Sequence, residues 1–176
     1  MNVCRNPLLL LALVGAALLA FSGCGKRSEP VDSPSTQALS TQALSTQVTP
    51  SKAGWITSYE QGQQEAKANN KLVLLDFTGS DWCGWCKLLD REVFSKPQFK
   101  EYASKNLVLV ELDFPRMKPM SQEMRAQNTR LARQYQVEGF PTIIVLNGDG
   151  KVVGALGYLE GGPDAFIAQL ERLRKG

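Results

Sequence analysis

The feature that most constrains the fold is a buried-strand pattern followed, after a short turn, by two cysteines. Residues 72–77 form an apolar run interrupted only by Asp76, which is typical of a strand covered on both faces. After a polar turn, a helix is predicted to begin near Cys83 and to continue to about residue 93. Cys83 and Cys86 then lie three positions apart on one helix face, within disulfide distance. The sequence therefore predicts a cysteine pair at the start of a helix that follows a buried strand.

The rest of the chain from residue 54 to residue 176 predicts alternating helices and strands. Helical patterns cover residues 57–69, 97–105 and 121–135, and a last helix is expected from about residue 163. Further strands are expected at 107–113 and 142–146, with a returning strand at 151–156 after a turn. A βαβ unit followed by a hairpin and a helix predicts an α/β domain whose central mixed β-sheet has helices on both faces.

Composition excludes several kinds of chemistry. The 176 residues carry a net charge of only +3 and show no clustered basic face, which disfavours nucleic-acid binding. The absence of histidine removes His-based general-base catalysis and the commonest metal ligand. A structural zinc site usually needs four Cys or His ligands, so we predict no metal site. No glycine-rich phosphate loop of the required form is present, and we predict no organic cofactor.

The first 53 residues are predicted to be an export signal followed by a tether. Residues 1–23 combine Arg5 with an apolar run over 8–21, which is too short to span a membrane and is typical of a secretory signal. The following sequence Phe-Ser-Gly-Cys resembles the bacterial lipobox, which implies lipidation of Cys24. Ordinary cleavage nearby, leaving Cys24 as a free thiol, is the alternative. Residues 24–53 contain five-residue polar repeats that cannot form a core, so we predict a disordered tether.

Three motifs, in the expected order, make residues 70–160 resemble the thioredoxin fold family. They are the strand ending in Leu-Asp-Phe, the segment Trp82-Cys83-Gly84-Trp85-Cys86-Lys87, and the segment Val137-Glu138-Gly139-Phe140-Pro141-Thr142. Within that family the chain is most similar to exported bacterial thioredoxin-like proteins related to the C-terminal domain of thiol:disulfide interchange proteins. The resemblance implies a thioredoxin-like fold.

The resemblance also implies catalytic roles. Cys83, at the helix N-terminus, would attack as a thiolate, and the less exposed Cys86 would resolve the mixed disulfide. Pro141 corresponds to a cis-proline whose loop lies against the cysteines; a strand-entry proline is the alternative. Asp76 corresponds to a buried acid that accepts the Cys86 proton, and the alternative is a strand-end acid that reaches solvent.

The expected substrate-binding residues are Trp82, Trp85, Phe140 and Thr142. Trp82 corresponds to a tryptophan that walls the site, although simple core packing is the alternative. The backbone around Phe140 is expected to pair with the substrate chain as an added strand.

Several positions depart from the family pattern. Asp76 precedes Cys83 by seven residues where six are usual, which leaves Asp81 as a competitor for the acid role. The family's lysine that pairs with the buried acid aligns with Leu109, so this partner is expected to be missing, with Glu111 nearby instead. Trp85 replaces the usual proline between the cysteines, so the redox direction of the family, reduction or oxidation of substrates, cannot simply be assigned to this chain.

The predicted function is that of a thiol–disulfide oxidoreductase, preferentially a reductase, acting on exported proteins. It would take electrons from a membrane thiol donor and face the periplasm, with the outer membrane favoured, or the cell surface. The alternatives are an oxidase or isomerase on the same scaffold, a structural disulfide, and a non-catalytic binding lipoprotein. The loop at 114–119 is either a partner contact or a solvated loop.

Overall fold

The computed structural model of the chain describes residues 52–175. The predictions for the signal segment, for Cys24 and for the polar repeats concern residues outside this range. Among the described residues, no helix is both long enough and apolar enough to cross a membrane.

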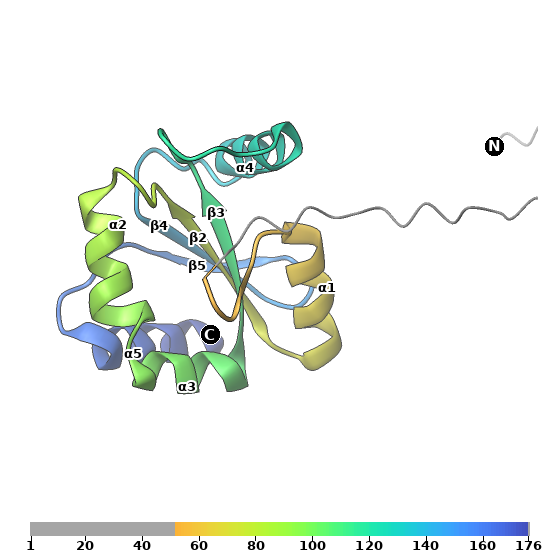
Figure 1. Cartoon of the computed structure of the whole chain (residues 1–176). Helices are drawn as coiled ribbons and strands as arrows, with labels where there is room; N and C mark the ends of the chain where they lie inside the picture. The colour runs from red at the N-terminus through yellow and green to blue at the C-terminus, as the bar shows by residue number, and fades with distance from the viewer. Residues whose placement is uncertain (1–51, 176) are drawn as a thin grey trace, which may run out of the picture. The chain divides into compact units, whose positions relative to one another are not determined.

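The domain is built on a five-stranded mixed sheet (Figure 1). The strands are β1 (Trp55–Ile56), β2 (Leu72–Thr78), β3 (Leu107–Asp113), β4 (Thr142–Leu146) and β5 (Val152–Leu156). Their order across the sheet is β1-β3-β2-β4-β5. The β1–β3 and β2–β3 pairs are parallel, whereas the β2–β4 and β4–β5 pairs are antiparallel. The predicted mixed sheet of an α/β domain is confirmed.

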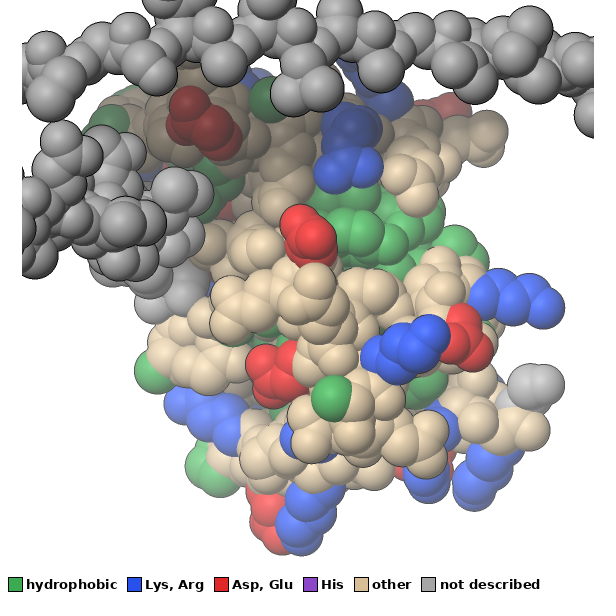
Figure 2. All heavy atoms as spheres, turned by 90° about the vertical axis from the view of Figure 1, so that its right-hand side faces the viewer, with side chains coloured by type: hydrophobic (Ala, Val, Ile, Leu, Met, Phe, Trp, Pro, Cys, Tyr) green, Lys and Arg blue, Asp and Glu red, His purple; other side chains and the backbone are tan. Residues whose placement is uncertain are grey.

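Helices cover both faces of this sheet, as predicted (Figure 1). They are α1 (Tyr59–Asn69), α2 (Gly84–Leu89), the π-helical turn η1 (Asp90–Phe94), α3 (Pro97–Asn106), α4 (Gln122–Gln134) and α5 (Gly162–Lys175). One hydrophobic cluster lies under α2, η1, α3 and α5, and a second lies under α1 and α4. Figure 2 shows the side on which α1 lies, where basic and acidic side chains are interspersed and a hydrophobic patch is visible.

The central strand β2 contributes to both clusters because its side chains alternate between the two faces. Leu74 packs under α2, α3 and α5, whereas Val73, Leu75 and Phe77 pack under α1 and α4. Asp76 has the same parity as Leu74 and therefore lies on the α2 face. The strand thus places one carboxyl group directly beneath the helix that carries the cysteines.

Two elements differ from the sequence prediction. Strand β1 was not predicted, because two residues are too few for an alternating pattern. The helix predicted from Cys83 to about residue 93 does not keep α-helical spacing, since η1 begins at Asp90. The consecutive residues Val93 and Phe94 are both buried within this π turn. A wider turn brings two adjacent side chains into the core, which a pattern based on 3.6 residues per turn does not reveal.

Candidate active site

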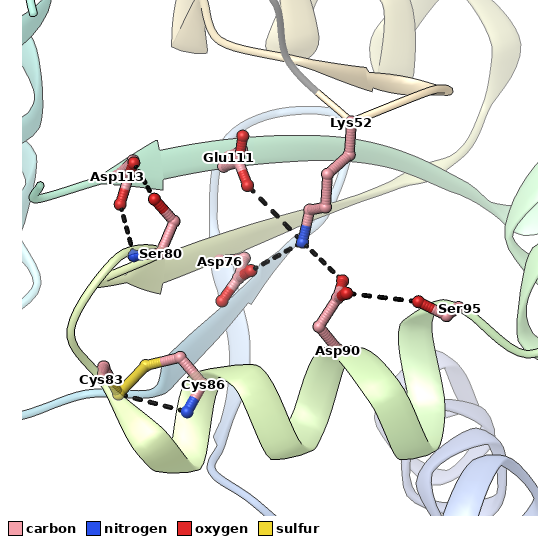
Figure 3. A network of polar contacts seen from close by, with 9 residues as sticks. All are labelled: Lys52, Asp76, Ser80, Cys83, Cys86, Asp90, Ser95, Glu111 and Asp113. Atoms are coloured by element: carbon pink, nitrogen blue, oxygen red, sulfur yellow. Dashed lines mark hydrogen bonds and ion pairs between the residues drawn. A yellow bond between two sulfur atoms is a disulfide. The ribbon is translucent and has the colours of Figure 1, made fainter. Parts of the chain in front are cut away.

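Cys83 and Cys86 form a disulfide at the start of α2 (Figure 3). The S–S distance is 2.09 Å and the Cα–Cα distance is 5.3 Å. Cys83 is the N-cap residue of α2, and its Sγ accepts a hydrogen bond from the Cys86 backbone N–H at 3.1 Å. After reduction, the same N–H and the positive end of the helix dipole favour a thiolate at Cys83. The sequence thus places one sulfur where an attacking thiolate is stabilised.

The prediction that Cys86 is the less exposed cysteine is wrong for this oxidised state. The exposed fractions of Cys83 and Cys86 are 5% and 6%. The disulfide bond holds the two sulfur atoms together, so both cysteines are covered to the same extent. Position at the helix N-terminus, and not exposure, distinguishes Cys83 from its partner.

The turn before Cys83 is shaped by a close contact between Gly79 and the Trp82 ring. A Cβ atom at position 79 would lie 2.5 Å from the Trp82 Cε2 atom, so the ring leaves no room for a side chain there. The Cys83 N–H donates to the Gly79 carbonyl oxygen at 2.8 Å. Trp82 Nε1 donates to the Phe114 carbonyl oxygen at 2.8 Å. The turn therefore fixes Trp82 and Cys83 together relative to the loop that follows β3.

The aromatic residues predicted to bind substrate fall into two groups. The rings of Trp82 and Phe140 meet edge to face, with centroids 5.8 Å apart. Trp85 is 61% exposed and instead contacts Tyr158, at a centroid distance of 5.4 Å. The structure thus places Trp82 beside Phe140, and Trp85 against a different aromatic neighbour.

The segment after Phe140 has the predicted local geometry. The Phe140–Pro141 peptide bond is cis. The Thr142 hydroxyl donates to the Gly139 carbonyl oxygen at 2.8 Å. This hydroxyl is therefore used to hold its own turn.

Asp76 is buried beneath α2, with only 2% of its surface exposed. The alternative in which it reaches solvent is therefore excluded. Figure 3 shows the carboxylate between the disulfide and Lys52. Oδ2 lies 3.7 Å from Lys52 Nζ, whereas Oδ1 has no hydrogen-bond partner within residues 52–175. Figure 3 shows this free oxygen on the side of the carboxylate that faces the cysteines.

The lysine partner that the sequence analysis found missing is supplied by Lys52. Its Nζ lies 3.0 Å from Asp90 Oδ1, 3.5 Å from Glu111 Oε1 and 3.7 Å from Asp76 Oδ2 (Figure 3). The same ammonium lies 4.2 Å from the centroid of the Trp55 ring. One cation is thus held among three carboxylates and above an aromatic face, which compensates for its partial burial.

The electrostatics of this cluster keep one proton available near neutral pH. Burial raises the pKa of Asp76 to about 7; Lys52 opposes this rise, whereas Glu111 and Asp90 add to it. Burial also raises the pKa of Glu111 above its usual range. For Lys52, burial alone would lower the pKa, but the three carboxylates outweigh it and raise the value. Lys52 therefore stays charged at the pH at which Asp76 titrates.

The sequence carries a signal for the three carboxylates of this cluster but none for Lys52. Asp76 and Glu111 are register partners in the parallel β2–β3 pair, so their side chains lie on the same face. Asp90 follows Cys86 by four residues, which places both on one face of the helix. Lys52 precedes β1 and lies in the stretch interpreted as tether, where no periodic pattern indicates a contact.

Asp81, the competitor for the acid role, has a different function in the structure. Its carboxylate accepts backbone N–H groups from Arg116, Met117 and Lys118. These hydrogen bonds, that of Met117 first, lower the pKa of Asp81 below its usual range. An ionised carboxylate occupied by three N–H donors anchors a loop and is unsuited to proton transfer.

A cavity of about 580 Å³ connects the cluster with the surface. Its lining includes Cys86, Lys52, Asp90 and Glu111, together with Lys118 and Met124. The cavity lies on the Cys86 side of the site. Three members of the cluster, Lys52, Asp90 and Glu111, line this cavity together with Cys86.

These features together define a class. A mixed sheet, a CxxC pair that caps the helix following the central strand, a buried acid beneath it and a cis-proline before β4 are those of a thiol–disulfide oxidoreductase. A family model described as "Thioredoxin-like domain" matches residues 59–174, and the chain belongs to this family. The resemblance inferred from the sequence is confirmed.

Individual relatives fit this assignment. The chain is 31% identical over 164 residues to "Disulfide bond reductase DsbH" of Chlamydia pneumoniae, covering 93% of this chain and 94% of that protein. A solved structure titled "DsbH Oxidoreductase" superposes with a TM-score of 0.65 at 30% identity, covering 72% of this chain and 91% of that one. The "Thiol:disulfide interchange protein DsbD" of Klebsiella pneumoniae is 34% identical over 92 residues, which are 52% of this chain but only 14% of that protein.

Proposed function

We propose that this thiol–disulfide oxidoreductase works as a reductase of disulfides in exported proteins. The observation that carries the proposal is the Cys83–Cys86 pair, with Cys83 at a helix N-terminus and a buried, proton-exchanging Asp76 beneath it. The relative that aligns over nearly its full length is named a disulfide bond reductase, which supports this direction.

The reaction transfers two electrons to the substrate. In the reduced protein, the Cys83 thiolate attacks one sulfur of a substrate disulfide, which forms a mixed disulfide and releases one substrate thiolate. Cys86 then loses its proton and attacks Cys83 Sγ. This step forms the Cys83–Cys86 disulfide and releases the second substrate thiolate. The two released thiolates take up protons, so that one disulfide is reduced to two thiols and one dithiol is oxidised.

Asp76 is the group placed to take the proton of Cys86. It is buried, its pKa of about 7 lies near neutral pH, and its Oδ1 accepts no hydrogen bond from the described part of the chain. Lys52 is a positioning residue: it holds Oδ2 and favours the ionised, accepting form of Asp76. The proton can then pass to solvent through the cavity lined by Glu111 and Asp90.

We further propose that the domain is tethered to a membrane through lipidated Cys24 and is re-reduced there by a membrane thiol carrier. The signal-like segment, the lipobox-like sequence and the polar repeats support this placement. Similarity to part of a thiol:disulfide interchange protein supports a donor of that kind. Labelling of the full chain by a radioactive fatty acid, lost in Cys24→Ala, tests the anchor. Labelling that persists in the variant contradicts it.

The direct test of function is to trap the mixed disulfide. Cys86→Ser should accumulate covalent complexes through Cys83, visible as bands that disappear on reduction. Cys83→Ser is the matched control, because it keeps one thiol of the same pair and should trap far fewer partners. Absence of trapped complexes in Cys86→Ser contradicts a catalytic role and favours a binding protein.

A further inference from the structure

The loop between β3 and α4 is fastened to the residues that immediately precede Cys83. Asp81 accepts the backbone N–H groups of Arg116, Met117 and Lys118, the shortest at 2.7 Å. Lys118 Nζ also donates to Ser80 Oγ at 3.1 Å. The bonds to Asp81 use only the backbone N–H groups of the loop. The loop is therefore held beside the active site, while residues 116–119 stay exposed to solvent.

The loop carries two cations that lack a carboxylate partner within residues 52–175. The Arg116 guanidinium lies over the Trp82 ring, 3.8 Å from its centroid, and Arg116 is exposed. Lys118 donates to a neutral hydroxyl, and Lys87 on α2 donates to the Asp81 carbonyl oxygen at 2.8 Å. The neighbouring carboxylates of Asp81 and Asp113 keep their charge while they accept hydrogen bonds from N–H and hydroxyl donors of the protein. Arg116, Lys118 and Lys87 (+3) together with Asp81 and Asp113 (−2) therefore sum to +1 at this surface.

Arg116 is positioned at the expected substrate surface. The Trp82 ring on which it stacks belongs to the residue before Cys83, and the same ring contacts Phe140 of the cis-proline segment. Next to Arg116, the side chain of Met117 is 80% exposed. A peptide bound against Trp82 and Phe140 thus meets a stacked guanidinium, a second cation and an exposed thioether.

From this arrangement we propose that Arg116 and Lys118 form a specificity subsite that selects substrate disulfides flanked by acidic residues. The inference rests on the proposed reductase function and specifies its substrate class. A carboxylate beside the substrate cystine pairs with Arg116 or Lys118, whereas a cation at that place is repelled. Because these pairs are exposed, their effect is mainly on the rate of encounter and is sensitive to salt.

The test uses the full reduced chain and three disulfide-bonded peptides that differ only beside the cystine, with Asp, Ser or Lys. Second-order rate constants are measured by the change in tryptophan fluorescence and divided by those for dithiothreitol, which removes the intrinsic reactivity of each peptide. We expect the Asp peptide to react faster than the Lys peptide by about fivefold for each cation engaged. At about 1 M salt, where the Debye length is about 3 Å, this preference should disappear.

The double variant Arg116→Gln/Lys118→Gln should bring the Asp-to-Lys ratio close to one. It keeps the backbone N–H groups that bind Asp81, so the loop stays in place. Lys100→Gln/Lys151→Gln is the matched control, since it removes the same charge from α3 and from the residue before β5 and should keep the ratio. Equal rates for the Asp and Lys peptides with the wild-type chain, or an unchanged Asp-to-Lys ratio in the double variant Arg116→Gln/Lys118→Gln, overturn the specificity inference but leave the proposed function standing. If none of the three peptides is reduced, the proposed function is overturned as well.

Discussion

Replacing Lys52 by Met tests the proton-transfer role of the buried cluster. The substitution removes the cation that lies 3.0 to 3.7 Å from Asp90, Glu111 and Asp76, while a Met side chain retains the apolar contact with Trp55. Without the ammonium, three carboxylates face one another. The protonated form of Asp76 is then favoured, and Cys86 loses its proton acceptor at neutral pH.

The expected size follows from the separation of the charges. At 3.7 Å and an effective dielectric constant of about 20, an ion pair is worth about 4 kcal/mol, or about 3 pH units. Lys52 is 31% exposed and is shared with two other carboxylates, so solvent and competition reduce this to a shift of about one to two pH units. Because the pKa of Asp76 is about 7, the ionised fraction at pH 7 then falls from about one half to between about a tenth and a hundredth.

The assay is the rate of reduction of a peptide disulfide by the reduced full chain between pH 5 and pH 9. In the wild type the rate should rise through about pH 7; in Lys52→Met the midpoint should move upward, with a loss of about fivefold to fiftyfold at pH 7 that high pH restores. Lys52→Arg should retain most of the rate, and Lys96→Met controls for loss of a lysine elsewhere. An unchanged or lower midpoint in Lys52→Met refutes the reasoning.

Two further substitutions test the surroundings of the cysteines. Folding raises the pKa of Asp76 from 3.8 to about 7, so the folded state binds the extra proton between these pH values and the free energy of unfolding falls as pH rises through this window. Asp76→Asn should remove this pH dependence and raise the free energy of unfolding at pH 7, measured by urea unfolding, by at most about 4 kcal/mol. An unchanged pH dependence in the variant contradicts this prediction. Gly79→Ala forces a Cβ against Trp82 and should cost about 1–3 kcal/mol, whereas Gly84→Ala meets open space and should cost nothing; equal effects argue against the contact.

The predictable parts of the fold are those that local sequence patterns indicate. The apolar runs of β2 and β3 and the hairpin of β4 and β5 each follow from neighbouring residues, and together they specified every strand of the sheet except β1. The cis bond before Pro141 came from the family resemblance, because sequence alone favours the trans form.

The parts that were not predictable depend on contacts between distant segments. Lys52 joins the cluster only because β1 pairs with β3 and brings the chain before it across the sheet. The anchoring of the 114–119 loop depends on Asp81, whose proximity no local pattern reveals. The similar exposed fractions of Cys83 and Cys86 result from the disulfide bond between them. The prediction that Cys86 would be less exposed did not take this bond into account.

The equilibrium redox potential of the Cys83–Cys86 pair measures most directly whether the protein is a reductase. It is obtained by equilibrating the full chain with graded ratios of reduced and oxidised glutathione or dithiothreitol and quantifying the free thiols of the pair. We predict a reversible couple near about −270 mV, the value of a thioredoxin that donates electrons. A value near about −120 mV, that of a strong oxidant, contradicts the proposed direction, and the absence of a reversible couple contradicts thiol–disulfide catalysis.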